Sequence, residues 1–388
     1  MRSKGRVVML SKQTIDIIKS TVPVLEVHGV AITKTFYHNL LTDHPALFNI
    51  FNRTNQSKGR QQGALANTVY AAAVHIENLE PIVPVVVRIA HKHRSLGVLP
   101  EHYTIVGEYL LAAIKEVLQD AATDAIIDAW AQAYGVIADI FISVEEDLYK
   151  AAEQDGGWRI FKSFNIARKE VESDCITSIY FTPADGAALP AATPGQYVTI
   201  RAQVPGEDYL MNRQYTLTEA TADYYRISVK TEKDASPAGI VSTFLHEAAI
   251  GTAIDMSTPA GTFTLQPTTT KALFIAGGVG VTPLHTMLQS MTAGNASFIQ
   301  CARNEKVAAF TESIAQKVAA LHGDMVSIYS EQQGHITAEQ IAAVYTEGMD
   351  VYVCGPTPFM ENVLAQLASL NVPTENIHFE FFGPALAL

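Results

Sequence analysis

The 388-residue chain has few charged residues, few cysteines and no long uncharged apolar run. Charged residues make up 17% of the chain and the net charge is −12, which argues against a nucleic-acid-binding surface. The three cysteines, Cys175, Cys301 and Cys354, are too far apart for a disulfide framework or a zinc site, so we expect a reducing, cytoplasmic location. Because no run reaches about 18 uncharged apolar residues, we expect no membrane span.

The texture of the sequence changes twice along the chain. Residues 11–152 are rich in alanine and poor in glycine, and their apolar residues recur at helical spacing, which predicts an all-α domain. The stretch EQDGGW then places two glycines after the last helix, so residues 153–157 are predicted to form a linker. The first ten residues, 1–10, have the character of a leader, and Met9 is a possible alternative start.

Two further domains are expected beyond the linker. Residues 158–266 alternate short β-branched and aromatic runs with turn residues, which predicts an antiparallel β-barrel. Residues 271–388 alternate strand-like and helical runs, which predicts a doubly wound parallel α/β domain. The expected fold class is therefore multidomain: all-α, then a β-barrel, then α/β.

A glycine-rich turn opens the α/β part directly after a strand, in FIAGGVGVTP. Gly277, Gly278 and Gly280 would allow the backbone to approach a phosphate, with Thr282 as helix N-cap and Pro283 as first helical residue. From the turn alone, a plain strand–helix connection explains the residues equally well.

A second turn of this kind ends a later strand at Cys354, Gly355 and Pro356. Turns that follow parallel strands lie at the carboxyl edge of the sheet, where ligands bind in doubly wound folds. The pair therefore favours a nucleotide site over two unrelated connections.

The segment VVVRIAHKHRSLGVLP raises a separate question about its histidines. Val86, Ile89 and Ala90 recur at helical spacing and His93 continues their stripe, whereas His91 lies toward the polar side. A histidine on an apolar face is either a core residue bonded to a backbone carbonyl or an axial metal or haem ligand. The helix by itself does not decide between them.

The two turns, GGVGVTP and CGP, resemble the nicotinamide half of ferredoxin-NADP reductase-like enzymes, and RQYT matches the R-x-Y-S/T signature of their flavin barrel. The resemblance implies that Arg213 binds the FAD diphosphate, that Tyr215 lies against the isoalloxazine, and that Thr216 bonds near the reactive flavin nitrogen. A plain strand aromatic is the alternative for Tyr215. The other implied cofactor-binding residues are Tyr197, Gln214, Gly239, Ser242, Thr243, Glu380, Phe381, Phe382, Gly383 and Pro384, with Phe382 against the flavin.

The helical part resembles a globin. Phe51 matches the phenylalanine that wedges the haem of globins, and ten residues later Gln61 heads an apolar stripe that includes Leu65. Tyr37 shares helical spacing with Val30, Thr33 and Leu41, so it should point inward. A lone inward tyrosine usually fills a core, but the resemblance implies that Tyr37, Gln61 and Leu65 face the distal side of a haem.

The whole chain, leader excepted, is similar to flavohaemoglobins. The resemblance implies that His93 is the proximal iron ligand, preceded by Lys92, and that Tyr103 and Glu145 form the proximal network. Glu146 and Asp147 leave the choice of carboxylate open, since three consecutive acids are otherwise a solvated helix face. The implied cofactors are haem b with its iron, FAD and NAD(P)H.

The resemblance also implies an activity, namely a nitric oxide dioxygenase that turns NO and O2 into nitrate with electrons from NAD(P)H. An O2 or NO sensor or carrier, and a general haem–flavin reductase for hydroperoxides, ferric iron or quinones, are the alternatives. The expected partners are these small molecules, with a lipid in the distal pocket left open, and we expect a monomer. The choice between NADH and NADPH is open because Arg303 could hold a 2′-phosphate or lie on the surface.

Overall fold

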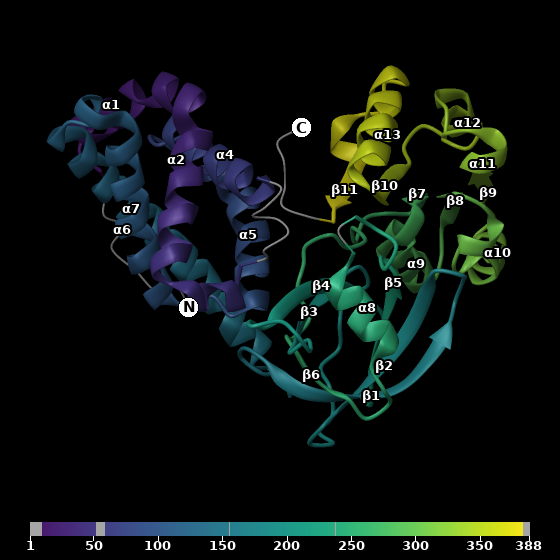
Figure 1. Cartoon of the computed structure of the whole chain (residues 1–388). Helices are drawn as coiled ribbons and strands as arrows, with labels where there is room; N and C mark the ends of the chain where they lie inside the picture. Colours follow the sequence, from purple (N-terminus) through teal and green to yellow (C-terminus); the bar gives the residue numbers. More distant parts are fainter. Residues whose placement is uncertain (1–9, 52–58, 155, 237, 383–388) are drawn as a thin grey trace. The chain divides into compact units, whose positions relative to one another are not determined.

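A computed structural model of the chain describes residues 10–51, 59–154, 156–236 and 238–382, and these fall into two compact units (Figure 1). The first is helical and extends to Ala151, together with Asp208–Asn212. The second holds Ala152–Glu207 and Arg213–Phe382 and contains both the barrel and the α/β part. The expected fold class, helical then antiparallel barrel then parallel α/β, is confirmed.

The helical unit is built of α-helices joined by short 3-10 turns. Residues from five of these helices form its core. The helices Val22–Asp43 and Arg60–Val74 pack closely, since a Cβ placed on Gly29 of the first would lie 3.6 Å from the Ala66 methyl group of the second. The elements are α1 (Lys12–Ser20), α2 (Val22–Asp43), η1 (Pro45–Asn49), α4 (Arg60–Val74), η2 (Glu80–Ile82), α5 (Val83–Leu96), α6 (Pro100–Leu118), η3 (Gln119–Ala121) and α7 (Asp124–Ala152).

The stripe expected on α5 is rotated from its predicted position. The buried residues of α5 are Val86, Ala90, Arg94 and Ser95, and His93 lies half-buried beside them. His91 is also half-buried rather than on the polar face, and burial, with the charge of Arg94, lowers its pKa to about 4. The reason is that α5 packs along the 86–90–94 ridge, whose four-residue step is equally compatible with the sequence pattern.

Helix α7 is, within the described ranges, the one helix long and apolar enough by length and composition to cross a membrane. Its side chains instead contribute to the core of the helical unit. Trp130 is buried and its indole nitrogen donates to Thr21 Oγ1 at 3.3 Å, and Glu145 is buried near its other end. These contacts identify α7 as a core helix of the helical unit.

The barrel closes in the order β1-β2-β5-β4-β3-β6, and the strands β1 with β2, β1 with β6, β2 with β5, β3 with β6 and β4 with β5 pair antiparallel. The sequence pattern missed its first and last strands, because the first is half exposed and rich in charge and the last is only four residues long. The elements are β1 (Lys162–Val171), β2 (Ile176–Pro183), β3 (Tyr197–Ala202), β4 (Met211–Ala220), β5 (Tyr225–Lys230), α8 (Ile240–Glu247) and β6 (Ala253–Met256).

The α/β part is a five-stranded parallel sheet in the order β11-β10-β7-β8-β9, with helices packed on it (Figure 1). Phe274 of its central strand is fully buried and stacks on Phe298 and Tyr352 at 5.9 and 5.3 Å. The elements are β7 (Lys271–Gly277), η4 (Gly278–Gly280), α9 (Val281–Ser290), β8 (Asn295–Ala302), η5 (Glu305–Val307), α10 (Thr311–Ala320), β9 (Met325–Tyr329), α11 (Ser330–Gln333), α12 (Ala338–Ala342), β10 (Asp350–Gly355), α13 (Thr357–Ser369), η6 (Thr374–Asn376) and β11 (Ile377–Phe381).

The aromatic stack in this sheet yields a test of the fold. Phe274→Ala should lower the free energy of unfolding by about 3–5 kcal/mol, because it leaves a cavity between two other rings. Val171→Ala, at an 80% exposed position of the same unit, should change it by less than about 0.5 kcal/mol. Urea unfolding of the full chain measures both, and equal losses would contradict this packing.

Candidate functional site

A buried hydrogen-bonded triad joins three helices of the helical unit. Glu145 of α7 is 3% exposed, and its Oε1 accepts from the Tyr103 hydroxyl of α6 at 2.6 Å. The same oxygen lies 2.7 Å from Nδ1 of His93 on α5, and the Tyr103 oxygen lies 3.1 Å from that nitrogen. Since a carboxylate accepts only, Nδ1 carries the proton and Nε2 presents its lone pair. The imidazole is therefore set up to ligate a metal through Nε2.

The structure also distinguishes the three consecutive acids. Glu145 faces His93. Glu146 lies 3.7 Å from Lys150 on a partly exposed face, and Asp147 is exposed on the same helix. Burial and the neighbouring Glu145 carboxylate raise the pKa of Tyr103, so its proton stays in place to donate.

Close packing of α6 on α7 holds the triad together. A Cβ on Gly107 would come within 2.5 Å of the Tyr134 ring, so a glycine is needed where α7 crosses. The Tyr134 hydroxyl donates to the Tyr103 carbonyl at 2.5 Å, and Phe141 lies 5.8 Å from the His93 ring. No local sequence pattern indicates these supporting contacts, because the partners lie dozens of positions apart along the chain.

A second group of predicted residues lies around Tyr37 on α2. Tyr37 is 6% exposed and its ring meets Phe51 edge-on at 5.7 Å. Burial raises its pKa, and a side-chain hydrogen bond with Gln61 acts in the opposite direction. Gln61 therefore lies within hydrogen-bonding reach of the Tyr37 hydroxyl. Leu65 packs against the same core cluster.

Some neighbours differ from expectation. Val30, predicted to share the inward face of Tyr37, is 49% exposed, whereas Thr33 and Leu41, predicted on the same face, are buried. Lys92 is half-buried on α5. Among the other histidines of the helical unit, His28 and His38 are exposed, and Nδ1 of His102 accepts from the Leu99 amide at 2.9 Å.

The two glycine turns do meet at the carboxyl edge of the sheet. Ala276 of β7 pairs with Cys354 of β10, and a Cβ on Gly280 would overlap the Cys354 carbonyl. Side chains at Gly277 or Gly355 would collide with the Phe359 ring. Both turns thus require glycine for close approach, and the pairing of β7 with β10 brings them to the same edge of the sheet.

The helix start within the first turn is different from the predicted one. A 3-10 turn over Gly278–Gly280 precedes α9, which begins at Val281 with Gly280 as N-cap. Thr282 therefore lies inside the helix, where its hydroxyl donates to the Val279 carbonyl at 2.9 Å. Pro283 follows it in the first turn, and Pro356 caps α13 in the second glycine turn. The 3-10 turn shifts the cap by two residues.

The RQYT motif lies in β4. Burial lowers the pKa of Arg213 and raises that of Tyr215, while their mutual attraction opposes both shifts. Gln214 donates to Thr199 Oγ1 at 3.1 Å, and Thr216 is 7% exposed. Tyr197 of β3 lies over the backbone at Gly261, where a Cβ would be 3.0 Å from its ring.

Helix α8 presents another feature suited to an anion. Gly239 is its N-cap and its carbonyl accepts from Ser242 Oγ at 3.0 Å. Thr243 Oγ1 is buried without a hydrogen-bond partner in the structure. A buried hydroxyl left unpaired is costly, and a diphosphate oxygen at this helix start would satisfy it.

The closing aromatic segment forms β11 beside β10. Cys354 pairs with Glu380, and Gly355 with Phe381, in parallel register. Burial and the Glu380 charge raise the pKa of Cys354. Phe382 is 47% exposed after the strand. The predicted residues Gly383 and Pro384 lie outside the described residues.

Comparison with known proteins agrees with this architecture. Family models match the chain in three places: globin over residues 34–141, oxidoreductase FAD-binding domain over 165–265, and oxidoreductase NAD-binding domain over 274–365. A flavohemoprotein of Bacillus anthracis is 46% identical and covers 98% of this chain and 100% of its own length.

Two solved structures are also similar. The flavohemoglobin of Malassezia yamatoensis, crystallised with bound FAD and heme, is 26% identical, covers 96% of this chain and 100% of its own, and superposes with a TM-score of 0.85. The FAD/NAD-binding domain of a nitric oxide dioxygenase from Vibrio cholerae is 33% identical, covers 57% of this chain and 99% of its own, and has a TM-score of 0.52.

The fold and the matched domains define an oxidoreductase in which a globin is joined to FAD- and NAD-binding domains. Because the Bacillus anthracis flavohemoprotein is 46% identical over nearly the full length of both chains, this chain belongs to the flavohemoprotein family.

Proposed function

We propose that this protein is a nitric oxide dioxygenase that converts NO and O2 to nitrate with electrons from NAD(P)H. The observation that carries the proposal is the His93–Glu145–Tyr103 triad within a globin unit that shares its chain with a flavin reductase. The similarity to the Vibrio cholerae nitric oxide dioxygenase domain supports it. The cytoplasm is the compartment we propose.

The residues fit the implied cofactors. The proton on Nδ1 of His93 leaves Nε2 for haem iron, and the buried unpaired Thr243 hydroxyl beside the start of α8 suits the FAD diphosphate. Arg213 adds a planar cation that can fork to phosphate, and the glycine turn before α9 suits the NAD(P)H pyrophosphate. When bound, the haem supplies O2 activation and the flavin supplies single electrons from a two-electron donor.

On the side of His93, the chain contributes a hydrogen bond to a charged carboxylate. Glu145 accepts the Nδ1 proton of His93 without leaving its buried position, which raises the basicity of Nε2 and favours electron donation to a metal there. Tyr103 donates to the same carboxylate oxygen and so keeps it oriented toward the imidazole.

On the side of Tyr37, the chain contributes a hydroxyl group that is placed to donate a hydrogen bond. Tyr37 is buried, remains protonated and has a side-chain hydrogen bond with Gln61, so its O–H is placed to stabilise negative charge on a bound diatomic in surroundings poor in water. Phe51 holds the tyrosine ring in place by edge-on contact.

A sensor or carrier is the second candidate, and a general haem–flavin reductase is the third. A carrier has no use for the complete FAD- and NAD-binding half, which argues against it. A general reductase shares every feature of the site, so only its relative catalytic efficiency for each acceptor separates it from the dioxygenase.

The deciding experiment mixes purified, haem- and FAD-loaded protein with NADH and O2 and then adds NO. Sustained NO loss with nitrate as product, and one NADH oxidised per two NO consumed, is the expected result. Binding of NO without sustained NADH oxidation would instead identify a carrier.

Replacing the triad carboxylate tests its role. Glu145→Gln should lower NO turnover by about 10- to 100-fold while NADH still reduces the flavin at the normal rate, because the amide lacks the charge that makes His93 basic. Glu146→Gln, on the neighbouring partly exposed position, is the matched control and should behave as wild type. Unchanged turnover in Glu145→Gln would remove this residue from the mechanism.

Removal of the Tyr37 hydroxyl should affect O2 retention. Tyr37→Phe should speed O2 loss from the reduced protein by about 10- to 150-fold, since a hydrogen bond to a charged group is worth about 1.5–3 kcal/mol. Tyr109→Phe, which removes an exposed hydroxyl bonded to Asp43, should not. Stopped-flow O2 dissociation measures both rates, and equal rates would refute this role for Tyr37.

A further inference from the structure

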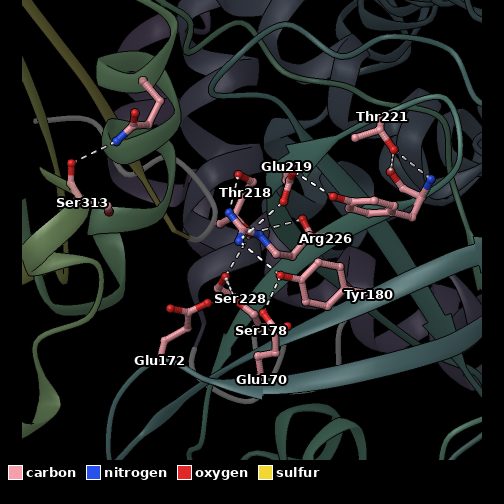
Figure 2. A network of polar contacts seen from close by, with 12 residues as sticks. Glu170, Glu172, Ser178, Tyr180, Thr218, Glu219, Thr221, Arg226, Ser228 and Ser313 are labelled. Atoms are coloured by element: carbon pink, nitrogen blue, oxygen red, sulfur yellow. Dashed lines mark hydrogen bonds and ion pairs between the residues drawn. The ribbon is translucent and has the colours of Figure 1, made fainter. Parts of the chain in front are cut away.

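Arg226 of β5 lies on the outer face of the barrel and is tied to the neighbouring strand β4 (Figure 2). Its Nε donates to Thr218 Oγ1 at 3.1 Å and its Nη2 donates to the Thr218 carbonyl at 3.0 Å. Its Nη1 lies 3.5 Å from a carboxylate oxygen of Glu219. Thr218 follows the last residue of the RQYT motif, Thr216, by two positions on the same strand.

The same guanidinium also reaches the α/β part of the unit. Its central carbon lies 5.9 Å from the ring centre of Phe310, at the outer limit of a cation–π contact. Phe310 in turn stacks on His285, with ring centres 4.5 Å apart and planes 13° from parallel. Burial, and secondly the Arg226 charge, lower the pKa of His285 to about 4, so the ring is neutral in this stack.

Phe310 is held in an unusual conformation. Its φ is +63°, in the left-handed region that bulky residues rarely adopt, at the N-cap of α10. Such strain persists where the surrounding contacts require one placement of the side chain. Here, those contacts are His285 on α9 and Arg226 on the barrel.

His285 provides the other end of the connection. It is 6% exposed, and its Nε2 lies 3.0 Å from Ser313 Oγ of α10, which itself donates to the Phe310 carbonyl. His285 lies on α9, two residues after Pro283 in the helix that begins at the glycine turn. The contacts therefore run from the strand with the flavin motif to the helix with the dinucleotide turn.

We propose that Arg226, Phe310 and His285, the interdomain stack, are positioning residues that set the distance and angle between nicotinamide and flavin. The inference rests on the proposed use of NAD(P)H and FAD. In the step concerned, a hydride leaves the nicotinamide, which is oxidised, and adds to the flavin, which is reduced. In this role the three residues act by holding β4 and α9 in one arrangement, through the contacts of Arg226 with Thr218 and of Phe310 with His285.

The test is anaerobic stopped-flow reduction of the flavin by saturating NADH and by 4-deuterated NADH, with the full cofactor-loaded chain. Arg226→Met should slow reduction by about 10- to 100-fold and alter the deuterium isotope effect, because small misplacements of reacting atoms cost rate at this scale. The NADH dissociation constant and the FAD content should stay unchanged. Arg226→Lys keeps the charge but not the fork, and should recover part of the rate.

Two further variants separate positioning from stability. Arg168→Met is the matched control, since Arg168 stacks on Tyr180 at 3.6 Å and pairs with Glu170, both within the barrel, and it should reduce its flavin at the wild-type rate. Phe310→Gly removes the ring and also relieves the positive φ, so slow reduction in this variant has its cause in the lost stack and not in backbone strain.

Specific results would overturn the inference. The inference is overturned if Arg226→Met reduces its flavin with the wild-type rate and isotope effect. It is also overturned if Arg168→Met is equally slow, or if the slow rate accompanies weaker NADH binding or a lower FAD content. If the wild-type protein reduces its flavin with NADH but does not consume NO, the dioxygenase proposal is refuted. The role of the interdomain stack is then still decided by the flavin-reduction rates of its own variants. If NADH does not reduce the wild-type flavin at all, both fail.

Discussion

The helical unit is organised around one buried charge. Removing the Glu145 carboxylate from water would be very unfavourable without partners, and the fold provides two donors to a single oxygen, from His93 and Tyr103. Because those donors come from α5 and α6 and the acceptor from α7, the charge is stable only when three helices keep one mutual register. The same requirement fixes the imidazole tautomer, so the constraint that stabilises the core also prepares the ligand nitrogen.

The reductase unit solves a different problem, the close approach of backbone to flat and charged cofactors. Glycines at Gly277, Gly280 and Gly355 remove side chains where two turns touch, and the parallel sheet brings both turns to one edge. The barrel contributes a strand whose cation and aromatic ring are both desolvated, together with a helix start that holds an unpaired hydroxyl. These are features of a surface that binds ligands. Each lowers the stability of the folded protein as long as no ligand is bound.

Local patterns in the sequence were enough to predict the fold class, because helical periodicity in residues 11–152 and strand–helix alternation after Lys271 are short-range signals. They did not predict β1, whose charged residues face solvent on a half-exposed strand, or the start of α9, which a 3-10 turn displaces. Within the site, contiguous motifs such as RQYT were visible. The choice of Glu145 among its acidic neighbours needed the resemblance, since its partner lies 52 positions away, and the contact between Arg226 and Phe310 had no signal at all.

Gly107 carries a consequence that its chemistry alone would hide. It has no polar side-chain atom and no contact with the histidine, yet the absence of a methyl group there lets the Tyr134 ring settle against α6 and hold the Tyr103 carbonyl. The geometry of the His93–Glu145–Tyr103 triad therefore depends on a position with no polar side chain, since a larger residue at 107 would displace the Tyr134 ring whose hydroxyl bonds to the Tyr103 carbonyl.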